Sequence, residues 1–427
     1  MSSWYRHLPS ELEPAGVELL AGGSLSSTWV ARWREQPQEA VIHDSEQGWV
    51  SGQELLDRSE IIARKLGRAG VEPGDRVLLS AASSVGLVAA HAAVLRLGAV
   101  VMPTNGAYRA EEVAHVVADA RPKVAIVEQP EWIEWIHAAD PNVVVTSPSV
   151  ELDMGPSVHL DQAQSDTPAL IGYTSGTTGR PKGAVLSHAN LLSSVRGLEI
   201  AWRWTADDTL ILALPLFHMH GLGVGLHGTL TVGAKAVLLP EFEVSQVLDS
   251  LQEFHATMFF GVPTMYGRLL ESTRADELKN LRLCVSGSAP LAAELHHKIY
   301  QITGQRVLER YGMTETAMLV SNPYEGERRP GSVGFPLPGV DIRLEGEPAE
   351  IQVKGPNVFS GYWERPNENL DAFVDGWFRT GDLGAIDSDG YLSIVGRAKE
   401  LIISGGFNVY PREVEDVISE YEPIQEC

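Results

Sequence analysis

Segments typical of strands alternate with segments typical of helices between residues 50 and 128, and this alternation constrains the fold most. Residues 51–70 have apolar side chains at helical spacing and end at Gly70, a plausible helix C-cap. A Pro-Gly-Asp turn then precedes RVLLS, which reads as a short buried strand. The pattern continues with helices over 85–98 and 110–122 and strands over 99–103 and 123–128, and strands recur over 236–240, 257–263 and 281–287. Such alternation predicts parallel sheets with helices on both faces.

Length and charge narrow the class of protein further. The chain has 427 residues, enough for two or three domains and a large core without disulfide or metal support. Its 33 basic and 56 acidic residues give a net charge of −23, which argues against nucleic acid or an anionic membrane as a partner. The two cysteines, Cys284 and Cys427, form neither a disulfide framework nor a zinc spacing.

Neither a targeting signal nor a membrane span is evident in the sequence. The N-terminus lacks a basic segment followed by a long apolar run, and Glu11 and Glu13 argue against a transit peptide. The most apolar stretch, 85–102, contains His91 and Arg96, so it reads as a buried helix and strand. A cytoplasmic location is therefore expected, and the sequence leaves the oligomeric state open.

From about Val333 the sequence pattern changes. Short segments in which apolar and polar residues alternate are separated by glycines, as in an antiparallel or barrel-like region. We therefore expect two doubly wound α/β subdomains, a small β-barrel-like subdomain and the start of a C-terminal domain. The expected ranges are 1–165, 166–325, 326–396 and 397–427.

A Gly/Ser/Thr-rich loop with one lysine is the sharpest chemical feature. The run from Tyr173 to Gly183, YTSGTTGRPKG, follows an apolar strand segment and precedes a helix for which Ser187 is a fair N-cap. Backbone amides, hydroxyls and Lys182 would converge there on a phosphate group. Pro181 and Gly183 flank the lysine, so the run is not a Walker A loop. The alternative is a flexible surface loop.

This loop resembles the signature of the adenylate-forming acyl-CoA synthetases. Three further motifs occur in the family's order: YGMTET (311–316), TGDL (380–383) and the hinge motif GRAKELIISGG (396–406). The resemblance implies that a carboxylate attacks the α-phosphate of ATP, and that the thiol of coenzyme A then displaces AMP. Mg²⁺ is the implied metal, because the first step brings two anions together.

The resemblance also implies a role for each motif residue. Thr174, Lys182, Thr314 and Glu315 would be catalytic, with Glu315 holding Mg²⁺. The expected nucleotide contacts are Thr174, Ser175, Gly176, Thr177, Thr178, Gly179, Lys182, Ser286, Gly287, Ser288, Ala289, Pro290, Glu309, Arg310, Tyr311, Gly312, Met313, Thr314, Asp382 and Arg397. Among these, residues 286–290 and 309–311 would bracket the adenine, Asp382 would hold the ribose, and Arg397 would support Asp382.

Two polar residues in the segments expected to form the acyl pocket point to an acidic substrate. Strand alternation puts Arg282 on the same face as Ser286, and a buried arginine needs an anionic partner. His220 adds a second polar group beside His218, and Met313 completes the expected substrate set. In the alternative interpretation, Arg282 points to solvent or pairs with a protein glutamate, and His220 is structural.

Several segments between residues 166 and 420 are most similar in sequence to those of malonyl-CoA synthetases. These segments include SGSAPL, LERYGMTET and SGGFNVYPREVE. This resemblance implies malonate, or methylmalonate, held at its distal carboxylate by Arg282 and His220. Two alternatives remain: a medium-chain or aromatic acyl-CoA ligase, and a truncated nucleotide-binding protein with impaired catalysis.

The end of the sequence carries a last expectation. Lys399 matches the family's hinge position, and an amphipathic helix is expected after Pro411, close to the end of the chain. The resemblance implies that most of the small C-terminal domain is absent, together with its lysine for adenylation.

Overall fold

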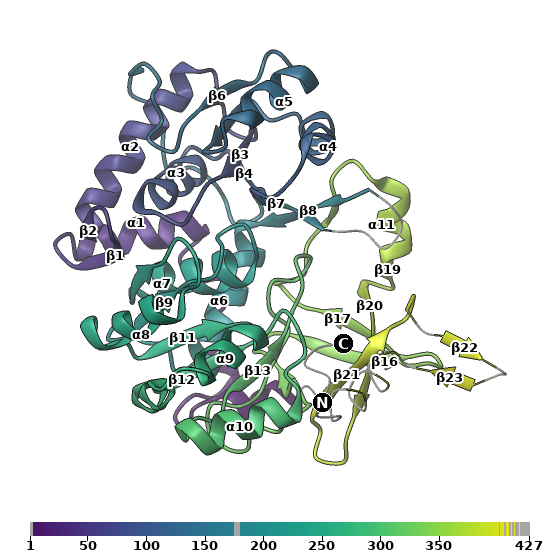
Figure 1. The fold of residues 1–427 in the computed structure, drawn as a ribbon. Coiled ribbons are helices and arrows are strands. Elements are labelled where there is room, and N and C mark those ends of the chain that lie inside the picture. The colour runs from purple at the N-terminus through teal and green to yellow at the C-terminus, as the bar shows by residue number, and fades with distance from the viewer. Residues whose placement is uncertain are drawn as a thin grey trace.

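The computed structural model describes residues 3–174 and 180–400, and beyond them 402–404, 407–409 and the single positions 411, 414 and 418. Two large sheets flanked by helices form most of the molecule, and a smaller antiparallel sheet lies beside them (Figure 1). The predicted combination of two α/β units with a β-rich unit is confirmed. No described helix is both long enough and apolar enough to cross a membrane.

The first large sheet carries the phosphate loop. Its order is β18-β8-β7-β4-β3-β5-β6, and the five strands from β7 to β6 run parallel. The strands are β3 (Arg76–Ser80), β4 (Val100–Pro103), β5 (Val124–Val127), β6 (Val144–Thr146), β7 (Pro168–Thr174), β8 (Lys182–Ser187) and β18 (Gly361–Tyr362). Its unit includes the helices α2 (Gly52–Arg68), α3 (Val85–Arg96), α4 (Ala110–Ala120) and α5 (Glu131–Ala139). Ser51 caps α2 in a capping box with Glu54.

The second large sheet has the order β15-β14-β13-β12-β11-β9-β10-β1-β2, with parallel pairing from β13 to β1. Its strands are β1 (Ala40–Asp44), β2 (Gly48–Ser51), β9 (Thr209–Leu212), β10 (Lys235–Leu238), β11 (Met258–Gly261), β12 (Leu283–Ser286), β13 (Leu308–Tyr311), β14 (Val320–Ser321) and β15 (Phe335–Pro336). The associated helices are α1 (Leu25–Glu35), α6 (His188–Trp202), α7 (His227–Val232), α8 (Val244–Glu253), α9 (Pro263–Leu270) and α10 (Ala293–Thr303), with single-turn or irregular helices η1 (Ser3–His7), η2 (Pro14–Gly16), η3 (His220–Leu226) and η4 (Ala275–Asn280).

The sheets do not follow the expected boundary at residue 165. The β7–β8 hairpin, which carries the phosphate loop, belongs to the first sheet, whereas β1 pairs with β10 of the second sheet through Ile42 and Ala236. The chain therefore passes from the second sheet to the first after β2 and back after β8, and β18 later joins the first sheet again, so a single boundary at residue 165 does not separate the two sheets. Local hydrophobic patterns locate strands but do not name their partners.

The small antiparallel sheet begins with β16 at Asp341, close to the change of sequence pattern near Val333. Strands β16 (Asp341–Glu345), β17 (Glu350–Lys354), β20 (Trp377–Ile386) and β19 (Phe373–Val374) pair in this order, and β21 (Leu392–Arg397) pairs with β20. Helix α11 (Pro366–Ala372) precedes β19, and β22 (Ile402–Ser404) pairs with β23 (Phe407–Val409). The helix expected after Pro411 lies mostly outside the described residues.

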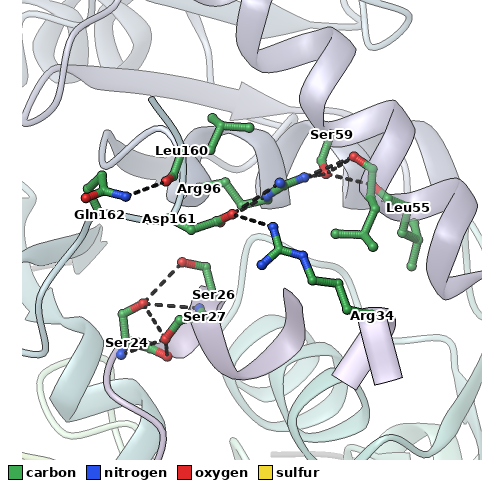
Figure 2. A network of polar contacts seen from close by, with 11 residues as sticks. Ser24, Ser26, Ser27, Arg34, Leu55, Ser59, Arg96, Leu160, Asp161 and Gln162 are labelled. Atoms are coloured by element: carbon green, nitrogen blue, oxygen red, sulfur yellow. Dashed lines mark hydrogen bonds and ion pairs between the residues drawn. The ribbon is translucent and has the colours of Figure 1, made fainter. Parts of the chain in front are cut away.

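A buried ion pair fastens the segment between β6 and β7 to the first unit. Arg96, on α3, donates through Nε to Asp161 Oδ1 at 3.0 Å, and its Nη1 donates to Ser59 Oγ at 2.6 Å on α2. Figure 2 shows Arg34 approaching the same carboxylate from α1, at 3.7 Å. Because Arg96 is only 3% exposed and fully paired, we interpret the cluster as structural.

Candidate active site

The phosphate loop leaves the first sheet between two paired strands. Thr174 ends β7 and Lys182 begins β8, and the two residues are antiparallel partners. Residues Ser175, Gly176, Thr177, Thr178 and Gly179 lie outside the described residues. The hairpin nevertheless fixes where the loop begins and ends. The Lys182 ammonium lies 5.5 Å from the ring centroid of Tyr362.

The YGMTET segment follows β13 and approaches β7 closely. A Cβ at Gly172 would lie 2.4 Å from the Thr314 side chain, so only glycine permits this contact. The contact brings Thr314 and Glu315 beside the strand that leads into the phosphate loop. The structure therefore brings together Thr174, Lys182, Thr314 and Glu315, the four residues expected to be catalytic.

Glu315 is a buried carboxylate, 5% exposed. Its Oε1 accepts a hydrogen bond from the Tyr362 hydroxyl at 3.0 Å. Burial raises the pKa of Glu315, and the Tyr362 hydrogen bond acts in the opposite direction. A buried carboxylate with free lone pairs favours a cation beside it.

These residues fit Mg²⁺. Among the described residues, no basic side chain forms an ion pair with Glu315, so its carboxylate is not neutralised by the protein there. No group of three or more metal-ligating side chains occurs in the described part of the chain, so the protein alone does not form a complete metal site there. Mg²⁺ is usually held by one or two carboxylates together with substrate phosphates and waters. A single oxygen donor beside the phosphate loop matches that pattern.

Asp382 lies on β20, within the small sheet. Its Oδ2 accepts from the Tyr311 hydroxyl at 2.5 Å, and its Oδ1 lies 3.1 Å from Arg397 Nε on β21. Burial raises the pKa of Asp382. The expected support by Arg397 is present, and Tyr311 joins the same group. Lys399 lies in an exposed turn after β21.

The carboxyl ends of β12 and β13 form a second polar cluster. Ser286 ends β12, and its register partner Glu309 is the second residue of β13, so the segment after Ser286 lies beside Arg310. Arg310 is 4% exposed, and its Nη2 donates to Ser288 Oγ at 3.3 Å. Its Nε is buried without a partner, and no described carboxylate forms an ion pair with it. Burial lowers the pKa of Arg310 to about 9.

His220 completes this cluster from η3. It is 3% exposed, with Nδ1 3.4 Å from Ser288 Oγ and Nε2 buried without a partner. Burial, with the nearby Arg310, lowers the pKa of His220 well below its usual value, so the ring is neutral. A Cβ at Gly287 would lie 2.4 Å from Arg310 Cζ, so glycine is what lets the guanidinium lie against the backbone.

The structure contradicts the expected position of Arg282. This residue precedes β12, at the amino end of the strand, whereas Ser286 lies at the carboxyl end. Its Nε and Nη2 donate to the two oxygens of Asp208 at 2.6 and 2.5 Å, and Nη1 donates to the Trp202 carbonyl at 3.0 Å. The carboxylate partner that Arg282 needs is thus supplied by the protein. Arg282 therefore has a structural role, and it lies at the amino end of β12, whereas Ser286 lies at the carboxyl end.

Arg310 was expected to bracket the adenine together with residues 286–290. The structure places it against Ser288 of that segment, and Ser288 also contacts His220 of the expected substrate set. The role of Arg310 in the site therefore stays a prediction. Of the other expected residues, His218, Ala289 and Pro290 are exposed, while Gly312 and Met313 are half-buried.

Comparison with known proteins agrees with this geometry. The AMP-binding enzyme family matches residues 29–363. A feruloyl-CoA synthase of Amycolatopsis is 36% identical over 88% of this chain and 79% of its own length. The mitochondrial malonate–CoA ligase of mouse is 36% identical, over 85% of this chain and 72% of its own length.

Solved structures give the same result. ATP-bound MatB from Rhodopseudomonas palustris has a TM-score of 0.86 at 40% identity, over 93% of this chain and 83% of that one. The o-succinylbenzoate–CoA synthetase of Bacillus subtilis, in complex with ATP and magnesium, has a TM-score of 0.86 at 30% identity, over 93% and 85% of the two chains. The chain therefore belongs to the AMP-binding enzyme family, and it is an adenylate-forming acyl-CoA ligase.

Proposed function

We propose that this ligase activates a short dicarboxylate, malonate foremost, with methylmalonate as the alternative. One carboxylate oxygen attacks the α-phosphorus of ATP, the bond to the β-phosphate oxygen breaks, and pyrophosphate leaves. The thiol of coenzyme A, losing its proton, then attacks the acyl carbon and AMP leaves. Malonyl-CoA is the product.

The observation that carries this proposal is the buried guanidinium of Arg310, which forms no ion pair among the described residues and has a buried Nε without a partner there. The neighbouring Glu309 favours its charge but does not pair with it, and a substrate carboxylate would reduce the remaining cost of burying the cation. Ser288 and neutral His220 lie around the same space and offer hydrogen bonds. A fatty or aromatic acid would leave Arg310 without an anionic partner, which disfavours those substrates.

The other residues supply binding and orientation. Lys182 would pair with the phosphates of ATP, Thr314 would contact the α-phosphate, and Asp382 would accept hydrogen bonds from the ribose hydroxyls. Mg²⁺ held by Glu315 would neutralise phosphate charge when it is bound. Arg310 would hold the distal carboxylate, which leaves the other carboxylate free to react.

The substrate names of the relatives are compatible with a dicarboxylate without deciding it. They include the dicarboxylates malonate and oxalate and the monocarboxylates ferulate and long-chain fatty acids. ATP–pyrophosphate exchange should therefore be measured in parallel with malonate, methylmalonate, oxalate, acetate, octanoate, 4-coumarate and ferulate. We expect the highest kcat/KM with malonate or methylmalonate. Faster exchange with octanoate, 4-coumarate or ferulate would overturn the proposal, and so would exchange with none of the acids.

A further inference from the structure

We infer that Tyr362 is a positioning residue that couples the magnesium-binding carboxylate to the phosphate-binding lysine. This inference rests on the proposed roles of Glu315 and Lys182. Tyr362 lies outside the four motifs at 173–183, 311–316, 380–383 and 396–406. Tyr362 belongs to β18, far along the chain from both groups.

Tyr362 contacts both groups at once, through different parts of its side chain. The hydroxyl donates to Glu315 Oε1 at 3.0 Å, while the ring lies 5.5 Å from the Lys182 ammonium. The hydroxyl occupies one lone pair of the carboxylate and so orients the other oxygen. Such hydrogen bonds to a metal-binding carboxylate commonly tune metal affinity. The ring face attracts the ammonium.

The segment around Tyr362 is held so that this arrangement is rigid. The Tyr362 backbone N–H donates to Asn369 Oδ1 at 2.6 Å, and Asn369 Nδ2 donates to the Tyr362 carbonyl at 3.1 Å. On one side, Trp363 N–H donates to the Gly183 carbonyl at 2.8 Å, next to Lys182. On the other, Phe359 N–H donates to the Glu315 carbonyl at 2.8 Å. The same short segment therefore fixes the backbone beside both groups.

The next residues fasten this segment to the other side of the phosphate loop. Arg365 forms an ion pair with Asp119 on α4. The same carboxylate accepts from the Tyr173 hydroxyl at 2.8 Å, one residue before Thr174. Residues 361–365 thus connect both ends of the phosphate-loop hairpin to Glu315. Tyr362 is the member of this segment whose side chain reaches the two charged groups.

The test separates the hydroxyl from the ring. Tyr362→Phe keeps the ring and removes the hydrogen bond to Glu315, and Tyr362→Leu removes both. Binding of ATP is measured by calorimetry without acid substrate, over a series of Mg²⁺ concentrations, and pyrophosphate exchange is measured with the best acid of the wild type. Thermal unfolding reports whether each variant folds.

For Tyr362→Phe we expect the Mg²⁺ concentration at half-saturation to rise about tenfold. ATP affinity without Mg²⁺ and kcat at saturating Mg²⁺ should stay close to wild type. For Tyr362→Leu we expect an additional loss of two- to fivefold in ATP affinity without Mg²⁺, from the lost ring contact.

Tyr391→Phe is the matched control. It removes a tyrosine hydroxyl that donates to the Glu327 carbonyl at 2.9 Å, from a ring that Arg329 also contacts. Its Mg²⁺ dependence should equal that of wild type. An unchanged Mg²⁺ dependence in Tyr362→Phe would overturn the inference, whether or not its thermal stability falls. Because ATP binding is measured without an acid, this result is independent of the substrate proposal.

Discussion

Arg310 and Arg282 differ in what surrounds each guanidinium. Arg282 faces Asp208, which is 2% exposed, and two backbone carbonyls. Arg310 donates to one serine among the described residues and has a buried Nε without a partner. Removing one partner of a buried ion pair destabilises the fold, whereas a buried guanidinium that forms no ion pair among the described residues can bind a ligand carboxylate. The two residues should therefore respond oppositely to substitution.

Replacing Arg282 should damage stability and spare substrate choice. In Arg282→Met the buried carboxylate of Asp208 loses its counter-ion, so the free energy of unfolding should fall by about 3 kcal/mol. Urea unfolding measures this change. The ratio of kcat/KM for malonate to that for propionate should remain at the wild-type value. A fall in kcat/KM for malonate but not for propionate, with an unchanged free energy of unfolding, would show that Arg282 contacts the substrate.

At the scale of elements, the proposed substrate site depends on the register of β12 and β13. The parallel register of Ser286 and Glu309 brings the Ser286–Ser288 segment against Arg310. Ser288 has a φ of 70°, a conformation that is uncommon for a residue other than glycine. Such strain is typical of segments that position functional groups.

Gly287→Ala tests this packing between segments. The added Cβ would overlap Arg310 Cζ at 2.4 Å, and the end of a flexible side chain can move away. We expect the variant to fold and to lose malonate-dependent exchange by tenfold or more, since the guanidinium is displaced. Exchange with propionate should change by less than threefold. Equal kcat/KM for malonate in variant and wild type would contradict this account of the site.

Sequence patterns predicted the elements well and their partners poorly. The expected strand over 76–80 and the helix over 85–98 are β3 and α3, because turn residues mark their ends clearly. The pairing of β1 with β10 and of β18 with β8 joins segments far apart in the chain, which no local pattern encodes. Strand alternation predicts on which face of the sheet Arg282 lies, but it does not predict at which end of strand β12. In a parallel sheet the carboxyl end carries the site, so the end decides the role.

At the scale of the whole molecule, a chain of net charge −23 is proposed to bind three anionic ligands. The field of the protein opposes them, so their binding depends on local cations at Lys182, Arg310 and Arg397. Buried histidines are a second property of the whole molecule. Burial lowers the pKa to about 4 for His7, about 3 for His91 and about 4 for His188.

These histidines predict loss of stability in mild acid. Below pH 6.5 the unfolded chain takes up protons that the folded chain does not, so stability falls as the pH drops from 6.5 toward the folded values near 3–4. At pH 5 each of the three would cost roughly 2 kcal/mol. Glu315 and Asp382, whose pKa values are raised, oppose this trend in part. Urea unfolding at pH 7.5 and 5.0 measures the net change, and equal or greater stability at pH 5.0 would contradict the prediction.

The selectivity of Arg310→Met tests the central claim most directly. Methionine fills a similar volume without charge, and propionate keeps the reacting carboxylate but lacks the distal one. We expect kcat/KM for malonate in pyrophosphate exchange to fall about 100-fold, as for a buried charge pair that loses one partner. For propionate it should stay within threefold of wild type. Retained malonate activity, or an equal loss with both acids, would show that Arg310 does not bind the distal carboxylate.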